Sequence, residues 1–110
     1  QLTTTTPLSH HRAVALALEQ LKDRSARRPL ADKLREPGIA GHAMTALEPL
    51  FDRPARKRRR EGALREIVLA RALWRCGDYE ETARRILEEY SRDVRALFAR
   101  HAAAVLREAP

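Results

Sequence analysis

The chain has 110 residues, enough for one small domain and too few for two separately folded ones. Ala and Leu carry most of its 44% hydrophobic content and aromatic residues make up only 5%, a composition that favours helices over a sheet. The formal charge is +7, and the single cysteine, Cys76, excludes an intrachain disulfide and any zinc site built on several thiolates.

The first predicted elements are a linker and a helix. Residues 1–8 contain four consecutive threonines and a proline, which is typical of an extended linker arriving from an upstream segment. Because the chain also lacks an initiator Met, we expect a piece of a longer protein. Ser9 is placed to cap a helix that runs to about Leu21, with an apolar face of Val14, Leu18 and Leu21.

The region 9–51 is predicted to hold weaker helices. After a charged break at residues 23–28, Pro29 fits the first turn of a short helix that Pro37 and Gly38 end. Another short helix is expected near residues 42–48, where His42 is placed to cap or anchor it. The basic residues 52–58 are predicted to form a loop.

Residues 59–107 are predicted to form a core of three helices. The first runs from about Arg59 to Cys76, is apolar on more than one face and should be the most buried. Gly77 is placed to end it, and Asp78 with Glu81 resembles a capping box for the next helix. The apolar stripes of the last two helices consist of Ala83, Ile86, Leu87 and Tyr90, and of Val94, Leu97, Phe98, His101 and Val105.

These elements predict an all-α fold of about five to six helices in a single domain at residues 9–110. The short turns between helices make consecutive helices antiparallel neighbours, as in a helical bundle or in HEAT-like hairpins. No apolar run approaches the ~20 residues that a membrane span requires. The compartment is not determined by the sequence.

No catalytic, cofactor-binding or metal-binding residues are predicted in this chain. The four glycines are isolated at helix boundaries rather than grouped in a phosphate-binding loop. No two of His10, His11, His42 and His101 have the i, i+4 spacing that presents two ligands to a metal. Cys76 and His101 fall on apolar helix faces, where a packing role is favoured for Cys76 and a hydrogen-bonded structural role for His101.

The densest local signal is the basic run 53–60, in which six of eight residues are Arg or Lys. Such a run is typical of a solvated loop, a contact with a polyanion or a targeting signal, in that order of expectation. The predominance of Arg among the basic residues also fits a coding bias toward GC-rich codons. The residues of a polyanion contact would be Arg53, Arg56, Lys57, Arg58, Arg59 and Arg60.

Several short strings between residues 39 and 106 resemble the helical, HEAT-like carboxyl-terminal region of bacterial FAD-dependent oxidoreductases. They are Gly41-His42-Ala43, Ala63-Leu64-Arg65-Glu66, Ala70-Arg71-Ala72-Leu73, Cys76-Gly77-Asp78, Ile86-Leu87-Glu88-Glu89-Tyr90 and Phe98-Ala99-Arg100-His101-Ala102. The resemblance implies a non-catalytic accessory domain whose partner is the catalytic domain of the same parent chain. FAD would bind to that separate domain, and no flavin contact is carried over to this chain.

Two alternatives remain open from the sequence. An independent module would bind nucleic acid or protein through the basic run. A tetratricopeptide-like adaptor is suggested by the turn at residues 77–81, and it would expose a groove formed by the helices at 59–76 and 79–90.

Overall fold

The computed structural model describes residues 7–45 and 53–110 of the chain. Within these ranges the protein is all-α and has no strand, which confirms the predicted fold class. The described elements are α1 (Leu8–Leu21), a short 3-10 helix η1 (Arg24–Ala26), α2 (Arg27–Leu34), α3 (Arg53–Arg75), α4 (Thr82–Tyr90) and α5 (Ala96–Leu106).

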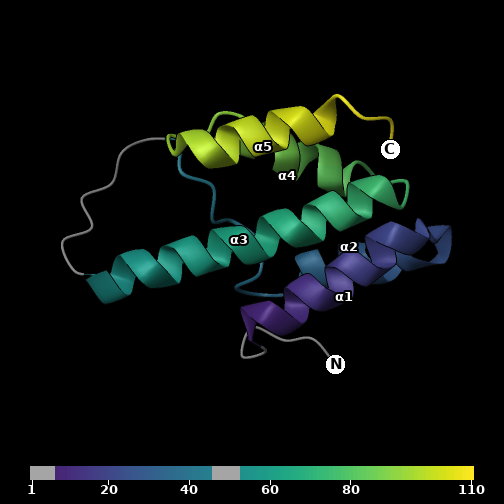
Figure 1. The fold of residues 1–110 in the computed structure, drawn as a ribbon, viewed down its shortest axis with the longest axis horizontal. Coiled ribbons are helices and arrows are strands. Elements are labelled where there is room, and N and C mark those ends of the chain that lie inside the picture. Colours follow the sequence, from purple (N-terminus) through teal and green to yellow (C-terminus); the bar gives the residue numbers. More distant parts are fainter. Residues whose placement is uncertain (1–6, 46–52) are drawn as a thin grey trace.

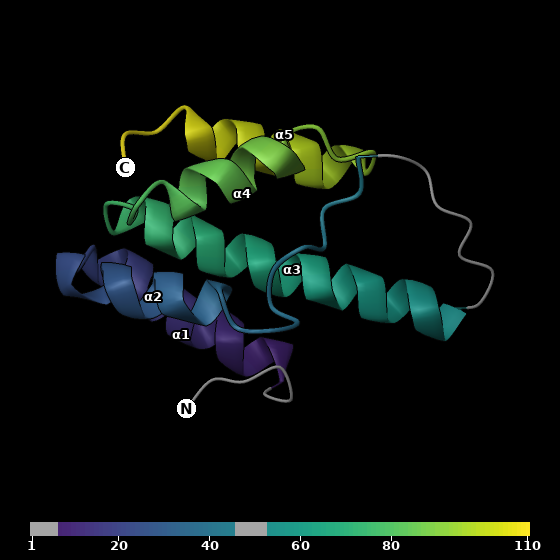
Figure 2. The ribbon, with the colours of Figure 1, turned by 180° about the vertical axis from the view of Figure 1, so that it is seen from behind.

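Helix α3 is the central element of the fold. It has 23 residues and is about 34 Å long, and it contacts each of the other four α-helices. Consecutive helices run in opposite directions, so that α1, α3 and α5 point one way and α2 and α4 the other (Figure 1). Figure 2 shows the same arrangement from behind, with α2 and α4 lying against α3.

The core is built around the carboxyl-terminal part of α3. Ala63, Leu69, Ala72 and Leu73 are fully buried, and Trp74 is nearly so. Small alanines let neighbouring helices approach closely, while each buried leucine stabilises the fold by about 1.5–3 kcal/mol relative to an exposed one. This part of α3 is buried on several faces, as the sequence predicts.

The buried face of α1 differs from the predicted one. His11, Ala15 and Glu19 are buried, whereas Leu21 is 72% exposed and Val14 is only partly covered. The apolar pattern fails here because α3 presents arginines toward α1, and a polar face with a histidine and a carboxylate satisfies them. The helix also begins at Leu8, before Ser9, and no side chain caps it.

The predicted basic loop at residues 52–58 is wrong for the described residues, because α3 already begins at Arg53. Pro54 occupies the first turn of the helix, where a missing backbone N–H costs nothing. Arginine is also among the better helix formers. The continuous helix therefore places the basic residues on a regular surface.

The short helix expected near residues 42–48 is absent from its described part, residues 42–45; residues 46–48 lie outside the described ranges, as do residues 1–6 of the expected linker. Residues 39–45 instead form an extended segment that crosses α3 (Figure 2). The preceding helix α2 ends at Leu34, ahead of Pro37 and Gly38 as predicted, and it contains Pro29 in its first turn.

The turn between α3 and α4 is held by Asp78. Its carboxylate accepts hydrogen bonds from the backbone N–H groups of Ala83 at 2.8 Å and Arg84 at 3.1 Å, which satisfies donors in the first turn of α4. Gly77 has a φ of 113° and follows the end of α3, as expected. The predicted capping box of Asp78 and Glu81 does not form, because Glu81 is itself the residue before α4 and has a left-handed backbone conformation.

Helix α5 buries Phe98, Ala102 and Val105 against α3 and α4. Val94 and Leu97, which were assigned to the same stripe, are 41% and 69% exposed. Val94 precedes the start of the helix at Ala96, so it does not follow helical spacing. None of the helices within residues 7–45 and 53–110 combines the length and apolar character needed to cross a bilayer.

Candidate functional site

The predicted polyanion residues lie on the first two turns of α3. Arg56, Lys57, Arg58 and Arg60 are exposed, and Arg59 is half-buried. Arg53 begins the helix, but its side chain lies outside the described part of the structure. In both Figure 1 and Figure 2 this end of α3 extends beyond the ends of α1 and α5. The helix thus gathers the basic residues on one projecting segment.

Glu66, in the middle of α3, is a buried acceptor for three donors. Its Oε1 accepts a hydrogen bond from the Tyr90 hydroxyl at 2.6 Å and from the His42 backbone N–H at 3.0 Å. Its Oε2 accepts from the Gly41 backbone N–H at 3.1 Å. Burial and the negative charge of Glu66 raise the pKa of Tyr90 far above its usual range. Glu66 therefore ties the extended segment and α4 to α3.

The His42 ring packs directly on α3 at Gly62. A Cβ atom at position 62 would lie 2.6 Å from His42 Nδ1, so only glycine leaves room for the ring. The other ring nitrogen, Nε2, is 2.8 Å from the Gly38 carbonyl oxygen. His42 therefore anchors the extended segment rather than a helix.

Asp93 holds the far end of the same segment. Its Oδ2 accepts a hydrogen bond from the Met44 backbone N–H at 2.9 Å and one from Arg95 Nη2 at 2.8 Å. Burial alone would raise the pKa of Asp93, but the hydrogen bonds from Arg95 and from backbone N–H groups outweigh it and lower that pKa. Arg95 also donates to the His42 carbonyl oxygen at 3.0 Å, which closes the attachment.

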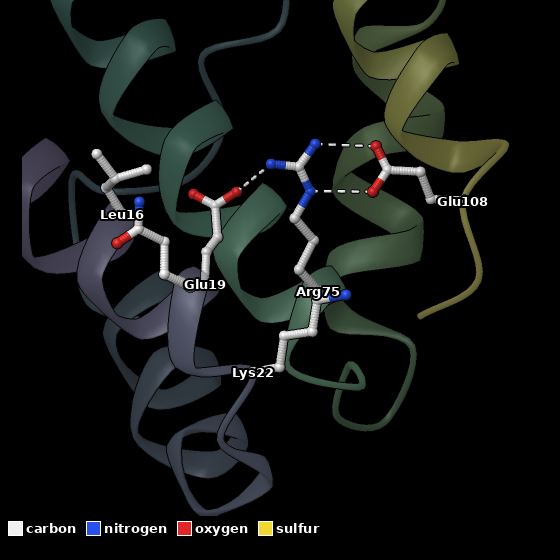
Figure 3. A pocket seen from close by; sticks show the side chains of 6 residues that line it. Leu16, Glu19, Lys22, Arg75 and Glu108 are labelled. Atoms are coloured by element: carbon white, nitrogen blue, oxygen red, sulfur yellow. Dashed lines mark hydrogen bonds and ion pairs between the residues drawn. The ribbon is translucent and has the colours of Figure 1, made fainter.

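A second polar cluster joins α1, the carboxyl-terminal end of α3 and the residues after α5 (Figure 3). The buried Glu19 pairs with Arg75 and also accepts a hydrogen bond from Arg71 Nη2 at 3.0 Å. Arg75 donates to both carboxylate oxygens of Glu108, at 3.0 and 2.9 Å. The bond to Glu108 raises the pKa of Arg75, although desolvation opposes the shift, and it lowers the pKa of Glu108.

This cluster borders an open pocket of about 400 Å³. The pocket is lined by Leu16 and Gln20 of α1, by Lys22 just after α1, and by the three residues of the cluster, Glu19, Arg75 and Glu108. Three of the charged groups that line it, Glu19, Arg75 and Glu108, are already bonded to one another, as the dashed lines in Figure 3 show. The pocket therefore presents this paired cluster together with the charge of Lys22.

The two histidines with perturbed pKa values are His11 and His101. Burial is the main cause in both, followed by a nearby arginine, and each pKa is lowered. His11 is fully buried, its Nδ1 accepts a hydrogen bond from Arg65 Nε at 3.1 Å, and its Nε2 has no partner among the described residues. His101 Nε2 lies 3.4 Å from Arg71 Nη1, the hydrogen-bonded structural role that was expected.

Cys76 is a buried packing residue, as predicted. Its Sγ is 3.5 Å from the Leu18 carbonyl oxygen, and burial raises the pKa of its thiol, which disfavours the reactive thiolate. Among the described residues, no group of three or more His, Cys, Asp or Glu side chains is arranged to hold a metal ion.

Sequence reasoning missed the structural role of the buried polar residues His11, Glu19, Glu66 and Asp93. A carboxylate beside a run of apolar residues in a helix, as at Glu66 before residues 67–70, is the one local signal in the sequence that marks such a residue. Apart from Arg95, which lies two positions after Asp93, the partners lie 24 to 56 positions away along the chain, so spacing alone does not identify them.

The facing sides of α3 and α4 are buried, with Leu73, Leu87 and Tyr90 at 0% exposure. This burial argues against the exposed groove that a tetratricopeptide-like adaptor would form from these two helices. Comparison of the chain with models of protein families, with curated proteins and with solved structures found no match.

Proposed function

We propose that this chain is a non-catalytic helical accessory domain and the carboxyl-terminal part of an FAD-dependent oxidoreductase. The observation that supports the proposal is the position of the residues that carry the resemblance. Gly41, His42, Glu66 and Tyr90 come from three separate strings, and they meet in one hydrogen-bonded group. The resemblance thus involves residues that determine this fold.

The chemistry of the polar residues also supports a structural role. The Tyr90 hydroxyl and the Glu66 carboxylate could exchange a proton in principle, but both residues are buried and bonded within the fold. Glu19 likewise forms ion pairs with Arg71 and Arg75 within the fold. A domain whose polar side chains are bonded internally in this way would contribute by contacting a partner with its surface.

The surface toward the catalytic domain is assigned to α1. This helix leaves Leu16 and Leu21 uncovered, at 48% and 72% exposure, although large apolar side chains gain stability when they are buried. The predicted linker precedes α1, so a domain joined there would lie next to it.

The test begins with the genomic reading frame upstream of Gln1. We expect the frame to encode a glycine-rich nucleotide-binding domain, and the protein expressed from the whole frame to carry bound flavin, visible in its absorption spectrum. A protein cut before Gln1 should keep the flavin, because no flavin contact is assigned to this chain. A natural frame that encodes only these residues would remove the proposed parent.

The contact surface is tested by mixing the chain with the truncated flavoprotein and measuring association by analytical ultracentrifugation. Leu16→Ser and Leu21→Ser should weaken the complex, whereas Leu97→Ser on α5, where the leucine is nearly as exposed as Leu21, should not. Equal weakening by all three variants would contradict the assignment to α1. Binding of free FAD by the chain alone would contradict a non-catalytic accessory role.

A further inference from the structure

The amino-terminal half of α3 is a helical segment whose side chains are mostly exposed. In its first two turns, Arg56, Lys57, Arg58 and Arg60 are exposed, and this end projects past the neighbouring helices (Figures 1 and 2). The buried part of the helix begins at Gly62 and Ala63. The exposed basic side chains of these two turns bury little apolar surface, so their charge is available for another purpose.

The charges on this segment repel one another within the protein. Arg56 and Arg60 are four residues apart, and Lys57 and Arg60 three apart, which are the spacings at which like charges destabilise a helix. The positive end of the helix macrodipole adds to the repulsion. Among the described ion pairs, none uses Arg56, Lys57, Arg58 or Arg60. A bound polyanion would relieve this repulsion.

The arginines of the other half of α3 show the contrast. Arg71 and Arg75 pair with the buried Glu19, and Arg75 also pairs with Glu108. The carboxylates of the protein thus neutralise the carboxyl-terminal half of α3. Among the described ion pairs, Arg56, Lys57, Arg58 and Arg60 have no such carboxylate, so their charge can meet an anionic partner.

The basic side chains surround the helix instead of forming a single stripe. Arg58 is about 200° around the helix axis from Arg56, with Lys57 and Arg60 on the arc between them. A hollow of about 220 Å³ lies on the Arg60 side, next to Leu97 and Phe98 of α5. Another of about 320 Å³ lies on the Arg58 side, next to His42. A ligand with anionic groups on two sides of the helix would meet charges on both.

The residue types of the segment favour one kind of polyanion as its partner over the others. Residues 53–62 contain no aromatic side chain, which disfavours the base stacking used by single-strand binders. Their apolar side chains are Pro54 and Ala55, too few for the apolar face of a membrane-surface helix. Arginine forks match phosphate oxygens, and the major groove of B-DNA, about 12 Å wide, admits a helix between two phosphate walls.

We infer that the amino-terminal half of α3 binds duplex DNA through its phosphate backbone, using Arg56, Lys57, Arg58 and Arg60. The binding is independent of base sequence, because phosphate contacts carry no sequence information. The inference does not depend on the proposed parent enzyme, and the two fail on different measurements.

The test is a fluorescence anisotropy titration of labelled duplex DNA with the full chain at several NaCl concentrations. Four phosphate contacts predict a slope of log K against log salt of about −3.6, so that a fourfold rise in salt weakens binding about 100-fold. The variant with Arg56→Gln, Lys57→Gln, Arg58→Gln and Arg60→Gln should lose this binding and keep the far-UV circular dichroism of the bundle.

The matched control removes four other exposed arginines, through Arg85→Gln, Arg92→Gln, Arg100→Gln and Arg107→Gln. It has the same net charge as the first variant and should retain most of the binding and the slope. Equal loss in both variants would mean general charge attraction and would overturn the inference. Tighter binding to single-stranded DNA, to RNA or to anionic vesicles than to duplex DNA would overturn it as well.

Discussion

Replacing Glu66 tests how the extended segment and α4 are attached to α3. Glu66→Ala removes the acceptor of the fully buried Tyr90 hydroxyl, and an unsatisfied buried group costs about 1–3 kcal/mol. It also removes the acceptor of the Gly41 and His42 backbone N–H groups. These lie nearer to solvent, so each lost bond costs about 0.5–1.5 kcal/mol.

The sum is about 2–6 kcal/mol, to be compared with a total stability of about 5–15 kcal/mol for a domain of this size. The assay is urea denaturation followed by far-UV circular dichroism, with the free energy of unfolding extrapolated to water. Glu66→Gln keeps the shape and one acceptor oxygen, so it should lose less. Glu89→Ala, on the exposed side of α4, is the control and should change stability by less than about 0.5 kcal/mol.

A double-mutant cycle that combines Glu66→Ala with Tyr90→Phe tests the hydrogen bond between these two residues more directly than either single variant. In the wild type, Tyr90→Phe should cost about 1 kcal/mol because it breaks one hydrogen bond. In the Glu66→Ala background it should cost nothing or stabilise, because it removes a hydroxyl that has lost its acceptor. Additivity of the two substitutions within about 0.5 kcal/mol would refute the proposed attachment.

Three further predictions concern other polar contacts. The pKa of the buried His11 is lowered in the folded state, so the unfolded chain binds a proton more readily than the folded one. The free energy of unfolding should therefore fall as the pH drops below about 6.5. Urea denaturation at several pH values should show a smaller fall for His11→Leu than for the wild type. Glu19→Gln should lower the free energy of unfolding by about 1–3 kcal/mol more than Glu108→Gln does, as measured by thermal and urea denaturation. The reason is burial: Glu19 is 3% exposed, whereas Glu108 is 44% exposed and water screens its ion pair with Arg75. Asp78→Ala should cost about 1–2 kcal/mol and reduce amide protection in the first turn of α4, while unchanged protection there would show that the carboxylate does not cap the helix.

The helices were predictable where the residues that stabilise them lie close together in the sequence. The buried part of α3 has apolar residues on several faces, Gly77 marks its end and the stripe with Leu87 and Tyr90 marks α4. These patterns follow from side-chain burial and backbone geometry over a few residues. They are sufficient for the fold class.

The errors occurred where distant polar groups decide the structure. Glu19 is a surface residue by its local pattern, but Arg71 and Arg75 turn it inward. A short helix was expected near residues 42–48, but Glu66 and Asp93 accept hydrogen bonds from the backbone N–H groups of Gly41, His42 and Met44, and residues 42–45 are not helical. Local sequence does not contain these partners.

The basic segment illustrates a different limit. Its charge density suggested a loop, because repulsion between neighbouring cations opposes helix formation. Continuity with the buried half of α3 and the helix propensity of arginine prevailed. The residues of the candidate site were identified from the sequence, whereas their arrangement around a projecting helix was not.

We propose that one half of α3 is buried and holds the bundle, and that the other half is basic and binds phosphate. Amide hydrogen exchange along α3, measured by NMR with and without duplex DNA, tests this division of the helix. We predict that residues 63–75 are strongly protected in the free protein, and that residues 55–60 are weakly protected and gain protection when DNA is added. Equal protection of both halves in the free protein, or no change at residues 55–60 with DNA, would contradict the claim.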